Sequence, residues 1–414
     1  MSAAAAAVPE TMRAAVLRGV GDIAVEERPV PAPGLGEVLV EIAAVGVCGS
    51  DTHYLLHGRI GPHVVREPLV LGHEASGRVV AVGEGVDPAR VGERVSLEPG
   101  VPCGTCPTCR SGRYNLCPQM VFHATPPVDG SMQQHVAIHA SMAHPVPDEV
   151  SDVAAAMLEP LSVGIWACRR AEVALGDRVL VTGAGPVGLL AAQVARASGA
   201  DVVVSDVAPQ RRAVAAALGL RVHDPAEETA GAGPGPVEVL LECSGHPSAV
   251  ASGLEALAPA GRAVLVGMGG DEVSVPLSIL QDREVSVTGT FRYAGTWPTA
   301  VALAASGAVV LDALPVRTFA LDDAAAALTA GRDDPGLVKA LVVPGQARTS
   351  PDAPSPDAPS PGTSSPGTSS PGTPSAGTSS STPGQPPSPD TSTSRPGQPP
   401  SPGSRTTPDT EDRS

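Results

Sequence analysis

Apolar residues in the first part of the chain come in short runs that Gly and Pro residues separate. Short runs with many β-branched members, bounded by turn residues, are typical of strands. This pattern predicts strands at residues 14–17, 37–45, 77–82 and 94–97. Residues 12–160 are therefore predicted to fold as a β-rich domain.

The pattern changes after residue 160, where apolar β-branched runs alternate with stretches of helical spacing. The helical spacing occurs at residues 189–198 and 210–218. The β-branched runs are residues 178–182, 201–204, 237–242 and 262–266. Such alternation is the pattern of a buried, doubly wound parallel sheet. Residues 161–295 are predicted to form this α/β domain.

The stretch 296–345 resembles neither pattern alone. It has helical spacing at 296–306, an apolar run at 319–321, an alanine-rich helix and a final strand at 338–343. We expect this stretch to return to the first domain.

The two ends of the chain differ from the rest in composition. From about residue 348 the sequence is rich in Pro, Ser, Thr and Gly, with near-repeats such as PGTSSPGTSSPGT. Such a segment cannot bury enough apolar surface to order itself, so residues 346–414 are predicted to be a disordered tail, either a tether or a dispensable extension. Residues 1–11 are also predicted to be disordered. They lack the features of a signal peptide or a membrane span, which favours a cytoplasmic protein.

The charge balance excludes two classes of partner. The chain has 27 Lys and Arg residues against 43 Asp and Glu residues, for a formal net charge of -16. Binding to phosphate backbones or to anionic membranes needs clustered basic residues, which are absent. We therefore expect neither a nucleic-acid nor a membrane partner.

A glycine motif follows the first predicted strand of the α/β domain. Gly183, Gly185 and Gly188 form G-x-G-x-x-G at the start of a helical stretch, and Asp206 ends the next strand. The glycines permit a tight turn and close approach of a pyrophosphate to the helix N-terminus. The carboxylate accepts hydrogen bonds from a ribose diol and repels a 2′-phosphate, so NAD is predicted. The alternative is a glycine-rich loop that binds no nucleotide.

Four cysteines, Cys103, Cys106, Cys109 and Cys117, lie in the stretch 100–118, which is rich in Gly, Pro and Thr. Four thiolates at this spacing can close a tetrahedral zinc shell and leave no position for water, which defines a structural site. The alternatives are free thiols or an iron–sulfur cluster, although the flanks lack the ferredoxin spacing. In a reducing compartment such a cluster indicates metal before disulfides.

Four further residues, Cys48, His73, Glu74 and Glu159, offer a thiolate, an imidazole and two carboxylates. Each has a simpler interpretation alone: a packed cysteine, a surface His–Glu pair and a helix cap. Together they are the ligand types that leave zinc an open position for water or an alcohol oxygen. We interpret them as a catalytic zinc site.

An open zinc site suits alcohol oxidation, because zinc stabilises the alkoxide from which a hydride passes to a nicotinamide. The released proton needs a path to solvent. Ser50 and His53, which follow Cys48 closely, are candidates for a hydroxyl and imidazole relay. Asp51 is a candidate to hydrogen-bond the His73 ring. The alternative for Ser50 and His53 is a pair of loop residues with local hydrogen bonds only.

These residues carry a resemblance to a known family. Its signature GHE-x2-G-x5-G-x2-V is present as Gly72, His73, Glu74, Gly77, Gly83 and Val86. The segments VCGSDTHY, EPLSVGIWACRRA and GTFRYAGTWPTAV are more specific. Over residues 12–343 the chain resembles the zinc-containing medium-chain alcohol dehydrogenases, and among them the sorbitol and xylitol dehydrogenases. The resemblance implies a GroES-like catalytic domain interrupted by a Rossmann domain, with the active site between them.

The resemblance also implies residue roles. Cys48, His73 and Glu74 match zinc ligands, and Glu159 stands where ordinary alcohol dehydrogenases have a cysteine; whether Glu74 or Glu159 is the direct third ligand stays open. The residues that match polyol contacts are Tyr54, Glu159, Arg292 and Tyr293. The residues that match cofactor contacts are Val187, Asp206, Arg211, Val266, Gly267, Met268, Thr290, Phe291 and Arg292. Two zinc ions per chain, NAD and a homotetramer or dimer follow as expectations.

The predicted function is oxidation of a secondary alcohol of a polyol, such as sorbitol or xylitol, to a ketose with hydride transfer to NAD. L-threonine dehydrogenase and butanediol dehydrogenase are the enzymatic alternatives, since they share the GHE motif and the cysteine cluster. A non-catalytic NAD-sensing protein is a further alternative. It predicts loss of zinc ligands or of the relay, and these residues are present.

Overall fold

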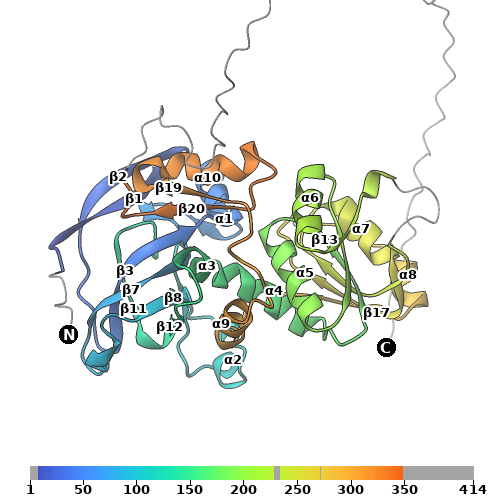
Figure 1. Cartoon of the computed structure of the whole chain (residues 1–414), viewed down its shortest axis with the longest axis horizontal. Helices are drawn as coiled ribbons and strands as arrows, with labels where there is room; N and C mark the ends of the chain where they lie inside the picture. The colour runs from blue at the N-terminus through green and yellow to red at the C-terminus, as the bar shows by residue number, and fades with distance from the viewer. Residues whose placement is uncertain (1–7, 228–233, 271, 348–414) are drawn as a thin grey trace, which may run out of the picture. The chain divides into compact units, whose positions relative to one another are not determined.

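The computed structural model describes residues 8–227, 234–270 and 272–347 (Figure 1). The predicted disordered segments lie largely outside these residues. However, β1 (Thr11–Gly19) begins inside the N-terminal segment predicted to be disordered, because Thr11 pairs with Pro29 of β2 (Asp22–Pro29). Among the described residues, no helix combines the length and the hydropathy that crossing a bilayer requires.

The β-rich domain is built on a seven-stranded sheet. Its members are β12 (Ala143–Pro145), β8 (Arg94–Leu97), β7 (Glu74–Val82), β3 (Glu37–Gly46), β20 (Lys339–Val343) and β19 (Val316–Ala320) in spatial order, with β11 (His135–His139) also paired to β3. Figure 1 shows the orange C-terminal strands β19 and β20 on the blue N-terminal sheet. The pairing of Leu341 with Gly46 brings the C-terminal strand beside the strand that leads to Cys48.

Smaller elements complete this domain. β1 and β2 form a second sheet with β6 (Leu69–Val70). One hydrophobic core joins the two sheets and includes residues far apart in sequence, such as Leu17, Val40, Leu97 and Val342. Because β3 and β7 are antiparallel, the end of β3 and the start of β7 lie at the same edge of the larger sheet.

The α/β domain is a six-stranded parallel sheet. Its spatial order is β15 (Arg221–His223), β14 (Asp201–Ser205), β13 (Arg178–Thr182), β16 (Val237–Glu242), β17 (Leu257–Leu265) and β18 (Ser286–Gly289). The central strands are buried along nearly their whole length, which explains their continuous apolar sequences. The chain reverses its direction of winding between β13 and β16, and ligands of such sheets bind at that point. The predicted fold class is confirmed.

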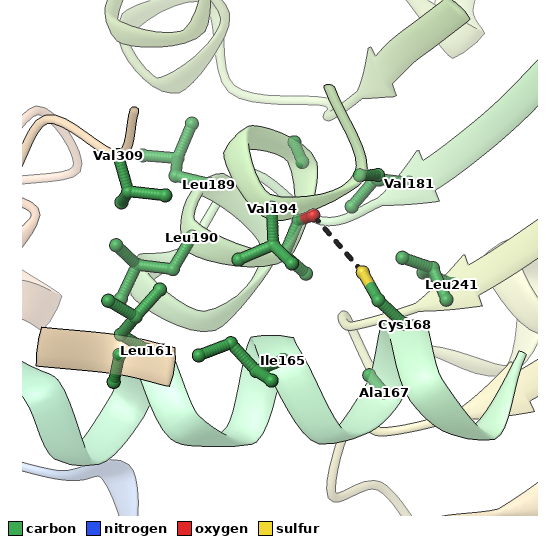
Figure 2. Packing of buried hydrophobic residues seen from close by; sticks show 14 of the residues in the cluster. Leu161, Ile165, Ala167, Cys168, Val181, Leu189, Leu190, Val194, Leu241 and Val309 are labelled. Atoms are coloured by element: carbon green, nitrogen blue, oxygen red, sulfur yellow. Dashed lines mark hydrogen bonds between the residues drawn. The ribbon is translucent and has the colours of Figure 1, made fainter. Parts of the chain in front are cut away.

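Helix α4 (Leu158–Arg170) links the two domains and packs on α5 (Pro186–Ala197). Figure 2 shows Leu161 and Ile165 of α4 against Leu190 and Val194 of α5. The helices approach closely at Gly164, where a Cβ atom would lie 2.9 Å from the Ala191 nitrogen. This contact fixes α4, which also carries Glu159 in its first turn.

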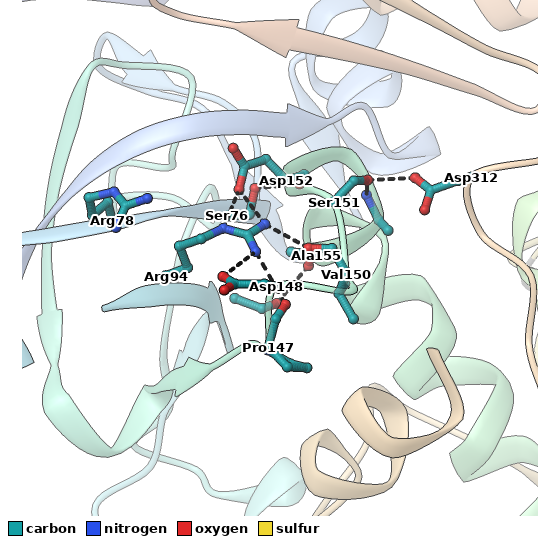
Figure 3. Close-up of polar contacts among 12 residues, drawn as sticks. Ser76, Arg78, Arg94, Pro147, Asp148, Val150, Ser151, Asp152, Ala155 and Asp312 are labelled. Carbon is teal, nitrogen blue, oxygen red and sulfur yellow. Dashed lines mark hydrogen bonds and ion pairs between the residues drawn. The ribbon is translucent and has the colours of Figure 1, made fainter. Parts of the chain in front are cut away.

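An arginine anchors the segment that leads into α4. Figure 3 shows Arg94 of β8 donating to the carbonyl of Val150, at 2.6 Å, and to the carboxylate of Asp152, at 2.7 Å. Asp152 begins the short helix α3 (Asp152–Ala156), and Ser76 of β7 donates to its carbonyl at 2.6 Å. The path of the chain toward Glu159 is therefore tied to two strands of the β-rich domain.

Candidate active site

The predicted catalytic zinc ligands meet at the ends of β3 and β7. Cys48 follows β3 and caps the N-terminus of α1 (Gly49–His57), and Glu74 opens β7 directly opposite Gly46. Possible ligand atoms of Cys48, His73 and Glu74 all lie within 4.8 Å of one another. Gly46 makes this possible, because a Cβ atom there would lie 2.1 Å from Oε2 of Glu74.

Glu74 is a buried carboxylate with a cationic partner. Its side chain is 1% exposed, and Nζ of Lys339 lies 2.7 Å from its Oε2. The ammonium donates hydrogen bonds to Oε1 of Glu74, at 2.8 Å, and to the Val47 carbonyl, at 3.0 Å. Oε2 is in ionic contact with this ammonium but accepts no hydrogen bond of acceptable angle among the described residues. A buried carboxylate oxygen with such an ionic contact still has a lone pair that can bind a metal ion.

Negative charge around His73 also fits a cation. Burial lowers the pKa of His73, but the Cys48 sulfur, Asp51 and Glu159 together raise it to about 10. Asp51 is fully buried, and its two carboxylate oxygens accept hydrogen bonds from the backbone amides of Cys48 and Gly72, each at 2.9 Å. Nδ1 of His73 lies 3.9 Å from Asp51 Oδ1. The donor set therefore suits zinc, with Asp51 behind the imidazole.

Glu159 lies near this cluster but differs from Glu74. It is not part of the group of possible ligand atoms that Cys48, His73 and Glu74 form. Its Oε1 accepts a hydrogen bond from the Tyr293 hydroxyl at 2.7 Å. Burial raises the pKa of Glu159 to about 7, against the lowering effect of His73. The structure thus separates the two acidic candidates by position and by partner.

The predicted polyol contacts converge on the same place. Burial raises the pKa of the Tyr54 phenol to about 12, with Asp51 raising it and Arg292 lowering it. The guanidinium carbon of Arg292 lies 3.6 Å from the centroid of the Phe122 ring. Burial lowers the pKa of Arg292, while Tyr293, Glu159 and Tyr54 raise it. A cation and two phenols therefore stand beside the metal-ligand cluster.

The two relay candidates lie in different settings on α1. His53 is exposed and lines a cavity of about 450 Å³ together with Cys48, Pro186 and Arg211. Ser50 is half-buried on the first turn of α1 and is not among the residues that line this cavity. The cavity has walls from both domains, so the Cys48 side and the glycine-rich loop face one space.

The glycine motif forms the turn that was predicted. Gly183 follows β13 with a φ of 90°, a conformation that favours glycine. A Cβ atom at Gly188 would lie 1.8 Å from the Gly183 carbonyl oxygen, whereas one at Gly185 would meet no atom within 4 Å. The open space at Gly185, at the start of α5, is where a pyrophosphate would approach the backbone.

Asp206 follows β14 and faces this loop. Its carboxylate accepts hydrogen bonds from the backbone amides of Ala184, at 2.7 Å, and Ala208, at 2.8 Å. One nitrogen of the Arg211 guanidinium lies 3.8 Å from Asp206 Oδ2. These contacts hold the carboxylate at the place that the dinucleotide motif predicts for a ribose contact.

The remaining predicted cofactor residues lie beyond the carboxyl ends of β17 and β18 or in the first turn of α5. Their backbone is closely packed: a Cβ atom at Gly267 would lie 2.1 Å from the Gly245 nitrogen. Exposed apolar side chains occur here too, with Met268 at 63% and Phe291 at 54% exposure. Val187, Val266, Thr290 and Arg292 belong to the same regions.

The four clustered cysteines form a second group of possible metal ligands. Their sulfur atoms all lie within 4.8 Å of one another, and the sulfur of Cys106 is 3.4 Å from that of Cys109 and 3.9 Å from that of Cys117. A tetrahedral zinc with bonds of about 2.3 Å requires sulfur separations of about 3.8 Å. The seven cysteines of the chain, all in the described part, form no disulfide. The cluster therefore fits a structural zinc.

Sequence reasoning missed several residues around these sites. They include Lys339, which is the single lysine of the chain, and Phe122. Tyr114 and Asn115, inside the cysteine cluster, contact Gly295 and Phe291. No local motif marks these residues, because each acts on a partner far away in the sequence.

Comparison with known proteins gives the family. Residues 34–148 match the model of the alcohol dehydrogenase GroES-like domain, and residues 186–306 match that of the zinc-binding dehydrogenases. The sorbitol dehydrogenase of Bos taurus is 43% identical over 343 residues, which cover 80% of this chain and 96% of that protein. The chain belongs to the zinc-binding dehydrogenase family.

Two solved structures of this family share the fold. The 2R,3R-butanediol dehydrogenase of Bacillus subtilis has a TM-score of 0.74 and 31% identity, covering 81% of this chain and 100% of that one. A short chain alcohol dehydrogenase of Escherichia coli, solved with NADH, has a TM-score of 0.75 and 28% identity with the same coverage. The predicted enzyme class and the resemblance to polyol dehydrogenases are confirmed for this zinc-binding dehydrogenase.

Proposed function

We propose that this zinc-binding dehydrogenase oxidises a secondary alcohol of a polyol, such as sorbitol or xylitol, to a ketose with NAD as hydride acceptor. One observation carries the proposal: the cluster of Cys48, His73 and Glu74 stands beside buried or half-buried hydrogen-bonding groups of Tyr54 and Arg292. A hydroxyl-rich substrate can satisfy such groups, whereas an apolar alcohol would leave them without partners.

Cys48, His73 and Glu74 would hold the catalytic zinc, and Glu159 would not be a direct ligand. When bound, zinc supplies the charge that makes an alcohol hydroxyl more acidic, and NAD supplies the hydride acceptor. Lys339 balances the charge of Glu74, and Tyr293 holds Glu159 in place. Asp51, whose Oδ1 lies 3.9 Å from Nδ1 of His73, would stabilise the imidazole through its charge.

The substrate would lie between Glu159 and Arg292. The Arg292 guanidinium and the Tyr54 hydroxyl can donate hydrogen bonds to hydroxyls of the polyol next to the reacting carbon. The Tyr293 hydroxyl donates to Oε1 of Glu159. The other carboxylate oxygen can accept a hydrogen bond from a substrate hydroxyl. These contacts would orient the reacting carbon toward the cofactor.

The proton of the reacting hydroxyl would leave through Ser50 and His53. The Ser50 hydroxyl can accept it and donate its own proton onward, and the exposed imidazole of His53 can accept that proton at the mouth of the cavity. Because His53 faces solvent, it can release the proton to water.

The dinucleotide would bind along the glycine-rich loop. The open approach at Gly185 accommodates the pyrophosphate, and the α5 N-terminus contributes its amides. Asp206 would accept hydrogen bonds from the adenosine ribose, with Arg211 beside it. A 2′-phosphate would be repelled by this carboxylate, which favours NAD over NADP. Val187, Val266, Gly267, Met268 and the segment Thr290 to Arg292 would line the nicotinamide side.

A substrate panel with metal analysis tests the proposal. Initial rates would be measured with sorbitol, xylitol, arabinitol, galactitol and L-threonine at saturating NAD, on protein whose zinc content is known. The proposal expects two zinc ions per chain and turnover of at least one polyol. Activity on L-threonine alone would refute it. Cys48→Ser should abolish turnover and leave one zinc ion, since the cysteine cluster is separate.

Butanediol oxidation is the second candidate. The likeness to the Bacillus subtilis butanediol dehydrogenase supports it, although the sorbitol dehydrogenase of Bos taurus is more similar in sequence. A vicinal diol offers one hydroxyl beside the reacting one, so it would engage fewer of the polar groups around Arg292. A kcat/KM for 2,3-butanediol above that for every polyol would favour this candidate.

We also propose a homo-oligomer, a tetramer or dimer, that works in the cytoplasm. β18 is an edge strand of the parallel sheet, and exposed apolar side chains occur in it and in the residues before and after it in the sequence. They include Val273, Val275, Leu277, Val287 and Phe291. The cysteine cluster needs thiolates, which a reducing compartment preserves. Light scattering on purified protein tests the oligomeric state, and cell fractionation tests the cytoplasmic location.

A further inference from the structure

A five-residue segment connects the cysteine cluster to the candidate active site. Residues 291–295 lie between β18 and α9 (Trp297–Ala305), and the segment carries Arg292 and Tyr293. It belongs to no helix or strand. Its conformation therefore depends on the groups that hold it from outside.

Two adjacent residues, Tyr114 and Asn115, lie between Cys109 and Cys117 of the cysteine cluster and contact the two ends of this segment. Nδ2 of Asn115 donates to the carbonyl of Phe291 at 2.8 Å. The backbone amide of Gly295 donates to the Tyr114 hydroxyl at 2.7 Å. Both residues belong to the single turn that directly precedes the metal-ligand candidate Cys117. Zinc binding by the four cysteines would thus fix the turn that makes both contacts.

Tyr114 is itself anchored on its other side. Its hydroxyl donates to Oε1 of Glu98 at 2.7 Å, and Oε2 of Glu98 lies 2.9 Å from Nε2 of His144. The His144 ring stacks on Trp297, with the centroids 5.4 Å apart. A phenol fixed by a buried carboxylate in this way presents its oxygen to Gly295 in one position.

The held segment has a backbone that needs support. Arg292 has a φ of 53°, in the left-handed region that an arginine adopts only when its surroundings fix it. Its guanidinium is stacked on Phe122, and the neighbouring Tyr293 donates to Glu159. The contacts of Tyr114 and Asn115 lie on either side of Arg292 and Tyr293. Small changes at the two contacts would therefore displace the groups that face the substrate.

We propose that Tyr114 and Asn115 are positioning residues, through which the cysteine cluster sets the preference of the enzyme for hydroxyl-rich substrates. They act on Arg292 and Tyr293 and do not touch the substrate. The proposal rests on the proposed function, because it assumes that these two side chains bind the polyol. A substrate without extra hydroxyls would be insensitive to their position.

Two variants test this assignment. Asn115→Leu keeps the branched shape and the number of side-chain heavy atoms but cannot donate to Phe291, and Tyr114→Phe loses only the hydroxyl. Each variant is assayed with the best polyol and with propan-2-ol, which has a single hydroxyl. All assays use saturating NAD, because Phe291 and Arg292 also border the proposed nicotinamide site. We expect kcat/KM for the polyol to fall about tenfold or more, mainly through KM, while kcat/KM for propan-2-ol changes little.

A matched control comes from the same cluster. The Ser111 hydroxyl donates to the Thr108 carbonyl at 3.0 Å, so Ser111→Ala changes the cysteine cluster without touching segment 291–295. This variant should keep the wild-type ratio of polyol to propan-2-ol activity. Zinc content is measured for all proteins, to show that the variants keep both metals. If Asn115→Leu does not fold, Tyr114→Phe gives the same comparison.

A second measurement does not depend on any substrate. Hydrogen exchange followed by mass spectrometry should show faster exchange in peptides that cover residues 291–297 in both variants but not in Ser111→Ala. Equal loss with both alcohols and unchanged exchange would show a merely structural role and overturn the proposal. If the wild-type protein oxidises no polyol, the proposed function fails while the exchange result still judges the contact between cluster and segment.

Discussion

Lys339, the single lysine of the chain, contacts the candidate metal ligand Glu74. Its ammonium is buried between Glu74 and the Val47 carbonyl, and Glu74 is 265 positions away in the sequence. The ligand candidates themselves could be predicted, because the GHE motif and the Cys48 segment are local patterns. The lysine could not, because its role depends on β20 lying beside β3.

Replacing this lysine should lower the folding stability, because buried Glu74 loses the ammonium that balances its charge. Lys339→Met removes the ammonium that pairs with buried Glu74 in the zinc-free protein, and breaking a buried pair in this way costs about 3–5 kcal/mol of folding stability. Urea unfolding of zinc-free protein measures the loss. Arg317→Met is the control, since it breaks the exposed pair with Asp334 and should cost less than about 1 kcal/mol. Equal losses in the two variants would contradict the prediction.

A buried histidine should make the stability depend on pH. Burial lowers the pKa of His123 to about 4, and its Nδ1 lies 3.3 Å from the Ser131 hydroxyl. The folded state keeps the ring neutral while the unfolded state protonates it near pH 6.5. The resulting loss of stability begins as the pH falls through about 6.5 and is complete below about 4, reaching about 3 kcal/mol.

His123→Gln isolates this effect. The variant has no titrating group at this position, so the unfolding free energy of the wild type should fall relative to that of the variant as the pH drops from 7 to 4. Urea unfolding of both proteins at several pH values gives the difference. A difference that does not change with pH would show that His123 is not the source.

At the scale of elements, hydrophobic periodicity predicted four strands of the α/β domain, β13, β14, β16 and β17, and two of its helices. The predicted strand 178–182 coincides with β13, and the helical stretches 189–198 and 210–218 fall on α5 and α6 (Pro209–Ala217). Helix α1 was not predicted, because its nine residues have only a weak apolar face. A usable signal was present: Asp51 accepts from the Cys48 amide at the helix start, as in a capping box.

The approach of α4 to α5 gives a prediction at this scale. At Gly164 a Cβ atom would lie 2.9 Å from the nitrogen and 3.0 Å from the Cα of Ala191, so backbone must move. Gly164→Ala should therefore destabilise the protein by about 1–3 kcal/mol despite its better helix propensity. Gly331→Ala, in α10 (Ala324–Asp333), meets nothing within 4 Å and should stabilise by about 0.5–1 kcal/mol. Thermal unfolding compares them, and a stabilised Gly164→Ala would contradict the close approach.

At the scale of the whole molecule, alternating strands and helices were enough to predict a parallel sheet, because that pattern has few solutions. The place of β20 between β3 and β19 follows from packing across the core and has no local sequence signal. The cavity of about 450 Å³ depends on both domains. Cys48 and His53 line it from the β-rich domain, and Pro186 and Arg211 line it from the α/β domain. A ligand in this cavity contacts two domains at once.

Dinucleotide binding should therefore stabilise the whole folded unit. NADH at about one hundred times its Kd should add about 2.7 kcal/mol to the unfolding free energy. In Asp206→Asn the charge that repels a 2′-phosphate is gone, so stabilisation by NADH should shrink and that by NADPH should appear. Asp201→Asn is the matched control, because Asp201 lies at the opposite end of β14 and pairs with exposed Arg221. Thermal shift with each nucleotide measures all three proteins. If the Asp206 variant kept the nucleotide preference of the wild type, selection of NAD would have to come from other residues of the cavity.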